Sequence, residues 1–259
     1  MKKIILFLLI IASANSFAQT TDFSLYQKQV YIKGSDTLPY RILLPLNYDA
    51  SKEYPLVIFL HGSGERGNDN QAQLAHGGDL FLQDSVRKAF PAIIVFPQCP
   101  VNSFWSNAKI IPDSTNRVFI FSTGGTPTTA MRSLIDLLSE LKHNYKIDKH
   151  SVYVGGLSMG GMGTFELVNR KPAIFAAAFS ICGGADTAIA PTIKHTAWWL
   201  FHGLKDNVVN PQFSVKMSEA LKNAGAEVIL NLYTNDNHNS WDDALAEKDL
   251  LPWLFSHHR

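Results

Sequence analysis

Short apolar runs alternate with amphipathic stretches along most of the chain. Pro55 precedes a continuous apolar run, Leu56–Leu60, whose length suits one strand. A run without polar alternation is typical of a strand that is covered on both faces of a sheet. The other runs of this kind are Ala92–Phe96, Val152–Val154, Ala176–Ile181, Trp198–Phe201 and Val228–Tyr233.

Helical patterns separate these runs. Thr126-Pro127 combines a capping residue with a first-turn proline and predicts a helix that extends to about His143. Because strands and helices alternate, the pattern predicts an α/β fold with a mostly parallel sheet and helices on both faces. The other predicted helices are Ser158–Arg170, Pro211–Ala224 and roughly Trp241–Ser256.

Two segments do not follow this alternation. Near the start, Gln29–Lys33 and Leu38–Leu44 flank Gly34-Ser35-Asp36 and predict a β-hairpin. The segment Val101–Gly125 fits no regular element, although it contains the apolar patch Val118–Phe121. A long irregular loop in a compact domain often forms a lid or a binding loop, and we expect that role here. The alternative is a surface insertion with no role.

The first eighteen residues have the order of an export signal. Lys2 and Lys3 precede an apolar run, Ile4–Ala12, and Ser16-Phe17-Ala18 offers a small-x-small cleavage site. The apolar run is too short to span a bilayer, and no cysteine near the site could carry a lipid anchor. We therefore expect cleavage after Ala18 and a periplasmic or secreted domain over residues 19–259, without stable membrane insertion. The alternative is an uncleaved N-terminal anchor.

Composition and charge narrow the range of partners. The chain has 259 residues, of which 46% are hydrophobic and 17% charged, which is ordinary for one globular domain. Its formal net charge is +1 and it has no basic block, so nucleic-acid binding has no electrostatic support. Cys99 and Cys182 form a disulfide or remain buried free thiols, and neither lies in a metal signature.

The stretch from Lys149 to Phe165 carries the strongest chemical signal. A short strand leads into Gly156-Leu157-Ser158-Met159-Gly160, and a helix follows, which is the setting of a nucleophile elbow. Glycine on both sides of Ser158 permits the sharp reversal of the chain. The Ser158 hydroxyl would then project into open space at a helix N-terminus.

A serine nucleophile needs a base, and the base needs an acid that holds its tautomer. In this arrangement the acid and the histidine follow the serine in that order. Asp206 and His238 each follow a predicted strand, so their side chains can converge with Ser158 at one edge of the sheet. Asp186 is the alternative acid. His202, at the end of its strand, has the pattern of a packed structural histidine.

The oxyanion formed by attack on a carbonyl needs preorganised donors. One predicted donor is the backbone N–H of Met159. The second comes from the glycine-rich loop after Leu60, with Ser63 first and Gly62 and Gly64 as substrate-contacting neighbours.

Side chains near these positions give weaker signals. Glu65 and Arg66 in the same loop are expected to form an ion pair rather than to touch substrate. Trp241, three residues past His238, is a candidate aromatic wall of the site. Trp105 is either such a wall or part of the core.

The nucleophile elbow is one of several sequence motifs along the chain that together resemble a known family. The chain resembles the small exported α/β-hydrolases of the esterase D and polyhydroxybutyrate-depolymerase-like branch through LHGSGERG, FPQCP with a following Trp, GLSMGGMGT, ICGGAD, HGLKDNVV and NHNSW. Members are often described as predicted peptidases or phospholipase/carboxylesterases and are close to carbohydrate esterase family 1, which includes feruloyl and acetylxylan esterases. The match runs from about Leu38 to the end. Two departures are the length of Ile110–Thr123 and the absence of the glycine that usually precedes His238.

The resemblance implies the same nucleophile, acid, base and oxyanion donors that the sequence pattern predicts. We therefore expect an exported α/β-hydrolase that uses no cofactor and cleaves a carboxylic ester, on carbohydrate or as a small ester. A serine peptidase related to prolyl oligopeptidase is the alternative enzyme. A non-catalytic carbohydrate-binding protein on the same fold is the alternative of another class.

Overall fold

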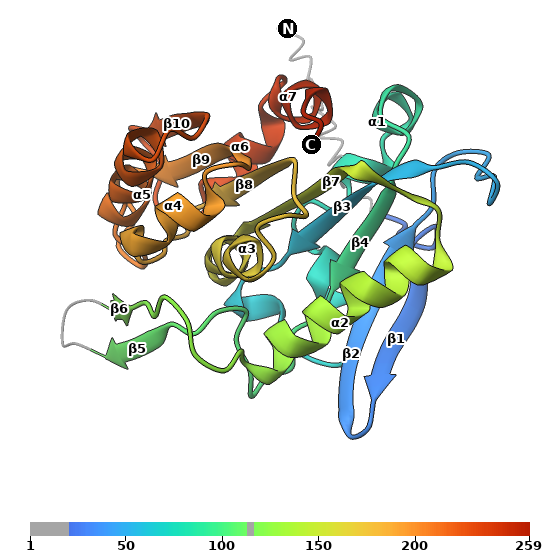
Figure 1. Cartoon of the computed structure of the whole chain (residues 1–259), viewed down its shortest axis with the longest axis horizontal. Coiled ribbons are helices and arrows are strands. Elements are labelled where there is room, and N and C mark those ends of the chain that lie inside the picture. The colour runs from blue at the N-terminus through green and yellow to red at the C-terminus, as the bar shows by residue number, and fades with distance from the viewer. Residues whose placement is uncertain (1–20, 113–116) are drawn as a thin grey trace, which may run out of the picture.

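The computed structural model describes residues 21–112 and 117–259, and it contains an eight-stranded sheet (Figure 1). The strand order is β1-β2-β4-β3-β7-β8-β9-β10. From β4 through β3 to β10 all neighbours are parallel, whereas β1–β2 and β2–β4 are antiparallel pairs. The strands are β1 Gln27–Lys33, β2 Asp36–Leu43, β3 Tyr54–Leu60, β4 Ile93–Pro97, β7 Ile147–Leu157, β8 Ala177–Ile181, β9 Ala197–Gly203 and β10 Val228–Tyr233.

All of the continuous apolar runs are strands, and those inside the sheet are buried on both faces, as predicted. The run Val228–Tyr233 is the exception, because it forms the edge strand β10, in which Ile229 and Leu232 are exposed. In β3, Leu56, Ile58 and Leu60 enter one core, while Val57 and Phe59 enter the other. The first core packs under helices α2, α3, α4 and α5, and the second packs under α1, α6 and α7 (Figure 1). The helices are α1 Asp84–Ala89, α2 Thr129–Asn144, α3 Met159–Arg170, α4 Ala190–Ile193, α5 Gln212–Asn223, α6 Trp241–Ala246 and α7 Leu250–Ser256.

Two predicted helix bounds were wrong. The first helix starts later than Thr126-Pro127, because the side chain of Thr128 accepts a hydrogen bond from the N–H of Met131 and caps α2. The predicted helix over Trp241–Ser256 is two helices, α6 and α7. Glu247 has extended backbone angles (φ −60°, ψ 118°) and separates them.

The segment Val101–Gly125 contains regular structure that its sequence did not reveal. Strands β5 (Lys109–Pro112) and β6 (Arg117–Ile120) form an antiparallel two-stranded sheet, which lies apart from the large sheet and below α3 (Figure 1). In β6, Phe119 is buried, whereas Val118 and Ile120 are exposed. Because all three residues are apolar, the period of two appears in their burial and not in the sequence pattern.

The N-terminal hairpin is confirmed, with Gly34 in its turn at φ +61°. Cys99 and Cys182 are both buried free thiols, so the disulfide alternative was wrong. The predicted signal, residues 1–18, lies outside the described residues. Within residues 21–112 and 117–259, no helix is long and apolar enough to cross a membrane.

Candidate active site

Ser158 stands in a strained turn between β7 and α3. Its backbone angles are φ +53° and ψ −116°, a conformation that is costly for a residue with a side chain. A Cβ on Gly156 would lie 2.5 Å from the carbonyl oxygen of Leu60, and one on Gly160 would lie 1.8 Å from the same oxygen. Glycine at both positions therefore lets β3 pack against the turn that presents the serine.

The structure brings the three predicted triad side chains together. Ser158 Oγ lies 2.9 Å from His238 Nε2, and His238 Nδ1 lies 2.7 Å from Asp206 Oδ2. Because a carboxylate oxygen can only accept, Nδ1 carries the imidazole proton and Nε2 is free to accept the serine proton. The arrangement matches a nucleophile, a base and an orienting acid.

The carboxylate of Asp206 is fully buried, and both of its oxygens have hydrogen-bond partners. Oδ1 accepts from the N–H groups of Val208 (2.8 Å) and Val209 (2.9 Å), while Oδ2 also lies 3.1 Å from His202 Nε2. Burial by itself raises the pKa of Asp206, but the hydrogen bonds from His202, His238 and the two backbone N–H groups outweigh it. The pKa of Asp206 is therefore held well below its usual range, and the group stays ionised.

The alternative acid occupies a different place. Asp186 accepts from the N–H of Ala188 and caps the short 3₁₀ helix Thr187–Ile189. Its side chain makes a local capping contact, whereas Asp206 contacts the base. The chain order allowed either carboxylate as the acid, and the geometry favours Asp206 over Asp186.

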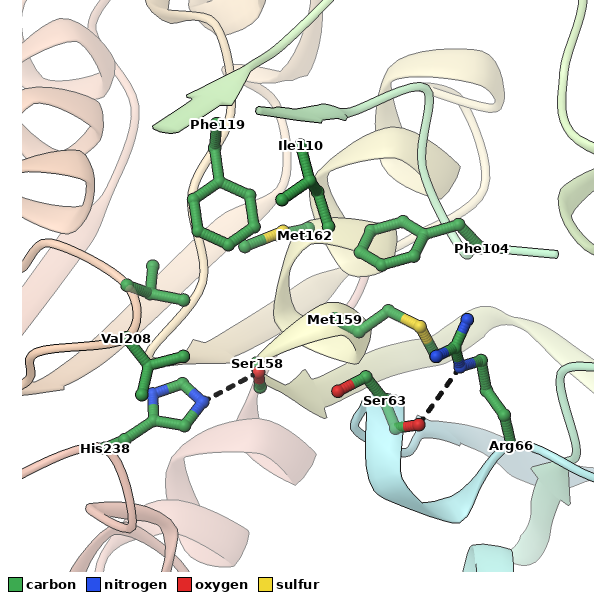
Figure 2. A pocket seen from close by; sticks show the side chains of 11 residues that line it. Ser63, Arg66, Phe104, Ile110, Phe119, Ser158, Met159, Met162, Val208 and His238 are labelled. Atoms are coloured by element: carbon green, nitrogen blue, oxygen red, sulfur yellow. Dashed lines mark hydrogen bonds between the residues drawn. The ribbon is translucent and has the colours of Figure 1, made fainter. Parts of the chain in front are cut away.

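A cavity of about 540 Å³ opens above Ser158 (Figure 2). Its size is in the range of small-molecule sites. Apart from Arg66 and His238, its side chains are apolar or hydroxyl-bearing. The lining residues are Ser63, Arg66, Phe104, Ile110, Phe119, Ser158, Met159, Met162, Val208, Val209 and His238. Ile110 and Phe119 come from β5 and β6, so the segment predicted as a lid or binding loop contributes directly to the cavity.

The two residues whose N–H groups are the predicted oxyanion donors both line this cavity. Met159 is the first residue of α3, where the helix leaves its N–H groups without intrahelical acceptors. Ser63 opens the 3₁₀ helix Ser63–Glu65 and also lines the cavity.

A buried histidine fixes the second of these N–H groups. His61 Nδ1 lies 2.6 Å from the carbonyl oxygen of Gly62, and Nε2 accepts from the N–H of Cys99 at 2.9 Å. Since the peptide unit is planar and trans, holding the Gly62 oxygen directs the Ser63 N–H away from His61. His61 thus orients the peptide that the sequence identified only as a glycine-rich turn.

The remaining predicted contacts differ in outcome. Gly62 lies against the elbow, since a Cβ there would be 3.8 Å from Ser158 Cβ, whereas Gly64 is exposed and does not line the cavity. Trp105 has no exposed surface and packs edge-on against His61, so the core-packing alternative holds. Trp241 contacts the His238 ring at 5.6 Å between centroids and faces a separate cavity of about 280 Å³.

The predicted ion pair between Glu65 and Arg66 was wrong. The carboxylate of Glu65 faces His61 at 4.0 Å and His76 at 3.9 Å. The guanidinium of Arg66 donates instead to the carbonyl oxygens of Ser63 (3.0 Å) and Val101 (3.1 Å) and lines the cavity.

Sequence reasoning missed the roles of two histidines. His202 was assigned to packing, yet it contacts the acid, and the signal was its position four residues before Asp206. Its Nδ1 lies 2.7 Å from Ser214 Oγ, which holds the ring in place. The signal for His61 was a histidine directly between a buried strand and a glycine-rich loop.

The sulfur of Cys182 also lies beside the triad. One ligand atom each of Cys182, Asp206 and His238 lie within 4.8 Å of one another, which is close enough to share a metal ion. Burial raises the pKa of the Cys182 thiol, so the site opposes the thiolate that a metal requires. The donor atoms of Asp206 and His238 are also already bonded to one another and to Ser158. The set fits a serine triad better than a metal centre.

Comparison with known proteins agrees with this geometry. A thermostable esterase of known structure superposes with a TM-score of 0.82 at 31% identity, over 92% of this chain and 64% of that chain. A CE1 ferulic acid esterase from Anaeromyces mucronatus, solved with ferulic acid, has a TM-score of 0.64 over 87% of this chain and 89% of its own. Its 17% identity shows a common fold alone.

Sequence relatives give the same picture over part of their length. A probable feruloyl esterase C from Aspergillus terreus is 25% identical over 183 residues, which are 69% of this chain and 58% of that protein. In two further curated relatives the chain spans 17% and 28% of the length. A profile of the phospholipase/carboxylesterase family matches residues 115–249, which include Ser158, Asp206 and His238. With more than half of its 259 residues matched, the chain belongs to the phospholipase/carboxylesterase family.

Proposed function

We propose that this chain is a serine hydrolase that cleaves carboxylic esters. The observation that carries the proposal is the continuous hydrogen-bonded line from Ser158 Oγ through His238 to the buried carboxylate of Asp206. This line ends at the floor of a cavity that can hold a small acyl group. Family membership supports the same reaction class.

Each residue has one task in the proposed reaction. His238 Nε2 removes the proton as Ser158 Oγ attacks the ester carbonyl, and the backbone N–H groups of Met159 and Ser63 stabilise the oxyanion. The tetrahedral intermediate collapses as His238 returns the proton to the leaving alcohol. Water, deprotonated by His238, then cleaves the acyl-enzyme and releases the carboxylic acid. Asp206 stays ionised throughout and stabilises the imidazolium.

The cavity favours an acyl part with an apolar body. Phe104, Phe119 and Met162 line it, and flat or branched apolar groups pack well against such side chains. The relatives include proteins described as feruloyl and acetylxylan esterases. We therefore propose feruloyl, acetyl or similar acyl groups, esterified to carbohydrate or to a small alcohol, as the substrate class.

A substrate panel with a matched inactive variant tests this proposal. Nitrophenyl esters of acetate, ferulate and longer acids are compared with dipeptide amides, using wild type and Ser158→Ala. We expect ester hydrolysis by wild type and a loss on the order of 10⁶ in turnover for the variant. Comparable activity of Ser158→Ala in a preparation free of other esterases would contradict the assignment.

The same panel distinguishes the two alternatives. Faster cleavage of the dipeptide amides than of any ester would identify a peptidase. A fluorophosphonate probe separates an enzyme from a binding protein, since it labels an activated serine. Labelling of wild type but not of Ser158→Ala is the expected result, and unlabelled wild type would favour the non-catalytic alternative.

A further inference from the structure

A second, shallow groove begins where the acyl cavity ends. It measures about 950 Å³ and shares Arg66 and Phe104 with the cavity above Ser158. Hydroxyl and amide side chains dominate its lining, with Arg66 and Lys109 as the charged groups. None of the described residues that line either space is acidic. The two spaces together form an apolar chamber that continues into a polar region of positive charge.

Arg66 is held at the boundary in a fixed orientation. Its Nε donates to the Ser63 oxygen, and its Nη1 donates to the oxygens of Val101 and Ser103. These acceptors are neutral carbonyls, and Arg66 makes no salt bridge with another described residue. A guanidinium positioned in this way, with no described carboxylate in salt-bridge contact, is preorganised for a planar anion.

The position of His238 decides which part of the ester meets Arg66. His238 lies on one side of Ser158, and Ser63 and Arg66 lie on the other (Figure 2). His238 must protonate the leaving oxygen, so the alcohol departs on the His238 side. The oxyanion faces the N–H groups of Met159 and Ser63. The acyl part therefore takes the remaining direction, into the cavity along Phe104, which leads to Arg66 where the cavity meets the groove.

We propose that the enzyme prefers acyl groups with an apolar body and a carboxylate at the far end, which Arg66 binds. This inference rests on the proposed ester hydrolysis and adds the charge of the acyl part. Within the proposed class of esters, the preferred substrate is then a monoester of a dicarboxylic acid, and water converts it into the dicarboxylate and the free alcohol. The second carboxylate takes no part in bond making or breaking.

Matched ester pairs test the proposal. One pair consists of methyl cinnamates with a carboxylate or a carboxamide at ring position 4. The other pair consists of monomethyl adipate and methyl adipamate, in which a carboxamide replaces the free carboxylate. Product formation is followed by chromatography for wild type, Arg66→Gln, Arg66→Lys and Lys88→Gln. Lys88→Gln removes the same charge from an exposed position on α1 and serves as the control. Thermal unfolding verifies that each variant is folded.

The readout is the ratio of kcat/KM between the carboxylate and the carboxamide of a pair. We expect wild type and Lys88→Gln to prefer the carboxylate by about tenfold or more in at least one pair. Arg66→Gln should lose this preference through KM, and Arg66→Lys should keep part of it. Because the ratio is taken within each enzyme, a general loss of activity from the altered loop does not affect it.

Two results overturn the inference while the proposed function stands. One is wild-type hydrolysis of plain methyl cinnamate with no preference for the carboxylate. The other is a preference that Arg66→Gln retains, which would assign Arg66 to the geometry of the loop. Failure of wild type to cleave any ester, together with failure to react with fluorophosphonate, would instead reject ester hydrolysis itself.

Discussion

Asp206 is shared between two histidines with different surroundings. His202 is completely buried and bonded to Ser214, whereas His238 is partly exposed at the cavity. The buried ring and two backbone N–H groups fix the carboxylate before the substrate arrives. A carboxylate held on all sides can then orient His238 without reorganising during the reaction.

This arrangement predicts the effect of two matched substitutions. Asp206→Asn should keep the fold but favour the wrong His238 tautomer, with a loss on the order of 10⁴ in turnover. Asp186→Asn removes a carboxylate that only caps a short 3₁₀ helix, so its turnover should stay close to that of wild type. Steady-state ester hydrolysis of both variants decides between them. A larger loss for Asp186→Asn would show that the acid is misassigned.

His61 is a second residue whose protonation state is fixed by its partners. Its Nδ1 faces the Gly62 oxygen and its Nε2 accepts from the Cys99 N–H, so the bonded form is the neutral ring. Burial lowers the pKa of His61 to about 4. In the unfolded chain the pKa of a histidine is about 6.5. The unfolded state therefore binds the proton first as the pH falls, and folding stability rises with pH between these two values.

The expected result is a loss of about 2 kcal/mol in the free energy of unfolding between pH 7 and pH 5, attributable to His61. A His61→Gln variant cannot titrate there, so this part of the pH dependence should disappear. Urea unfolding of both proteins at the two pH values measures it. The change in the free energy of unfolding between the two pH values is compared for the two proteins. The contributions of the remaining histidines cancel in this difference. An identical pH dependence in both proteins would contradict the assigned role of His61.

For single residues, the sequence predicts which side chains take part in the chemistry better than it predicts where the other side chains point. Chain order singled out Ser158 and His238 because each lies at a strand end beside glycine or loop residues. It could not place Trp105, since nothing in its neighbours distinguishes a buried ring from a cavity wall. The sequence also predicted an ion pair between Glu65 and Arg66, because they are neighbours in the chain. The fold instead brings His76, from a later turn, close to Glu65.

Among the elements, the close approach of α3 to β3 determines the position of the serine. Gly160 lies so near the carbonyl oxygen of Leu60 that a Cβ would overlap it at 1.8 Å. That oxygen belongs to the backbone of a central strand and cannot move aside. The elbow therefore depends on a glycine at this position, independently of the conformation of Ser158.

Gly160→Ala should accordingly lower the free energy of unfolding by at least about 3 kcal/mol. Gly64→Ala provides the matched control, because a Cβ there meets nothing within 4 Å. Its stability should lie within about 0.5 kcal/mol of wild type. Chemical denaturation followed by circular dichroism measures both. Equal stability of the two variants would show that α3 can shift away from β3.

The accuracy of element prediction depended on whether the decisive contact was local. The buried strands could be predicted because both faces of each one are apolar, which the sequence shows directly. The break between α6 and α7 could not, because the carboxylate of Glu247 accepts from Tyr233 and Asn231 of β10. These contacts favour a bend over continuation of the helix, and they depend on the tertiary fold.

For the whole molecule, the parallel part of the sheet explains why the site could be located. β7, β9 and β10 lead into Ser158, Asp206 and His238 respectively, and parallel strands end at the same edge. The strand order itself was not accessible from periodicity. The antiparallel placement of β2 beside β4, ahead of β3, depends on pairing between residues far apart in the chain, which periodicity does not show.

The first eighteen residues of the chain predict how the mature protein begins. We propose that the protein is exported and that the signal is removed after Ala18, so that the mature chain begins at Gln19. The basic, apolar and small-residue order of the first eighteen positions supports this. All strands and helices described above begin at Gln27 or later, so cleavage should leave the α/β domain intact. Intact-mass analysis of protein recovered from the periplasm or the medium tests the proposal. A mass that retains Met1 in the membrane fraction would identify an uncleaved anchor instead.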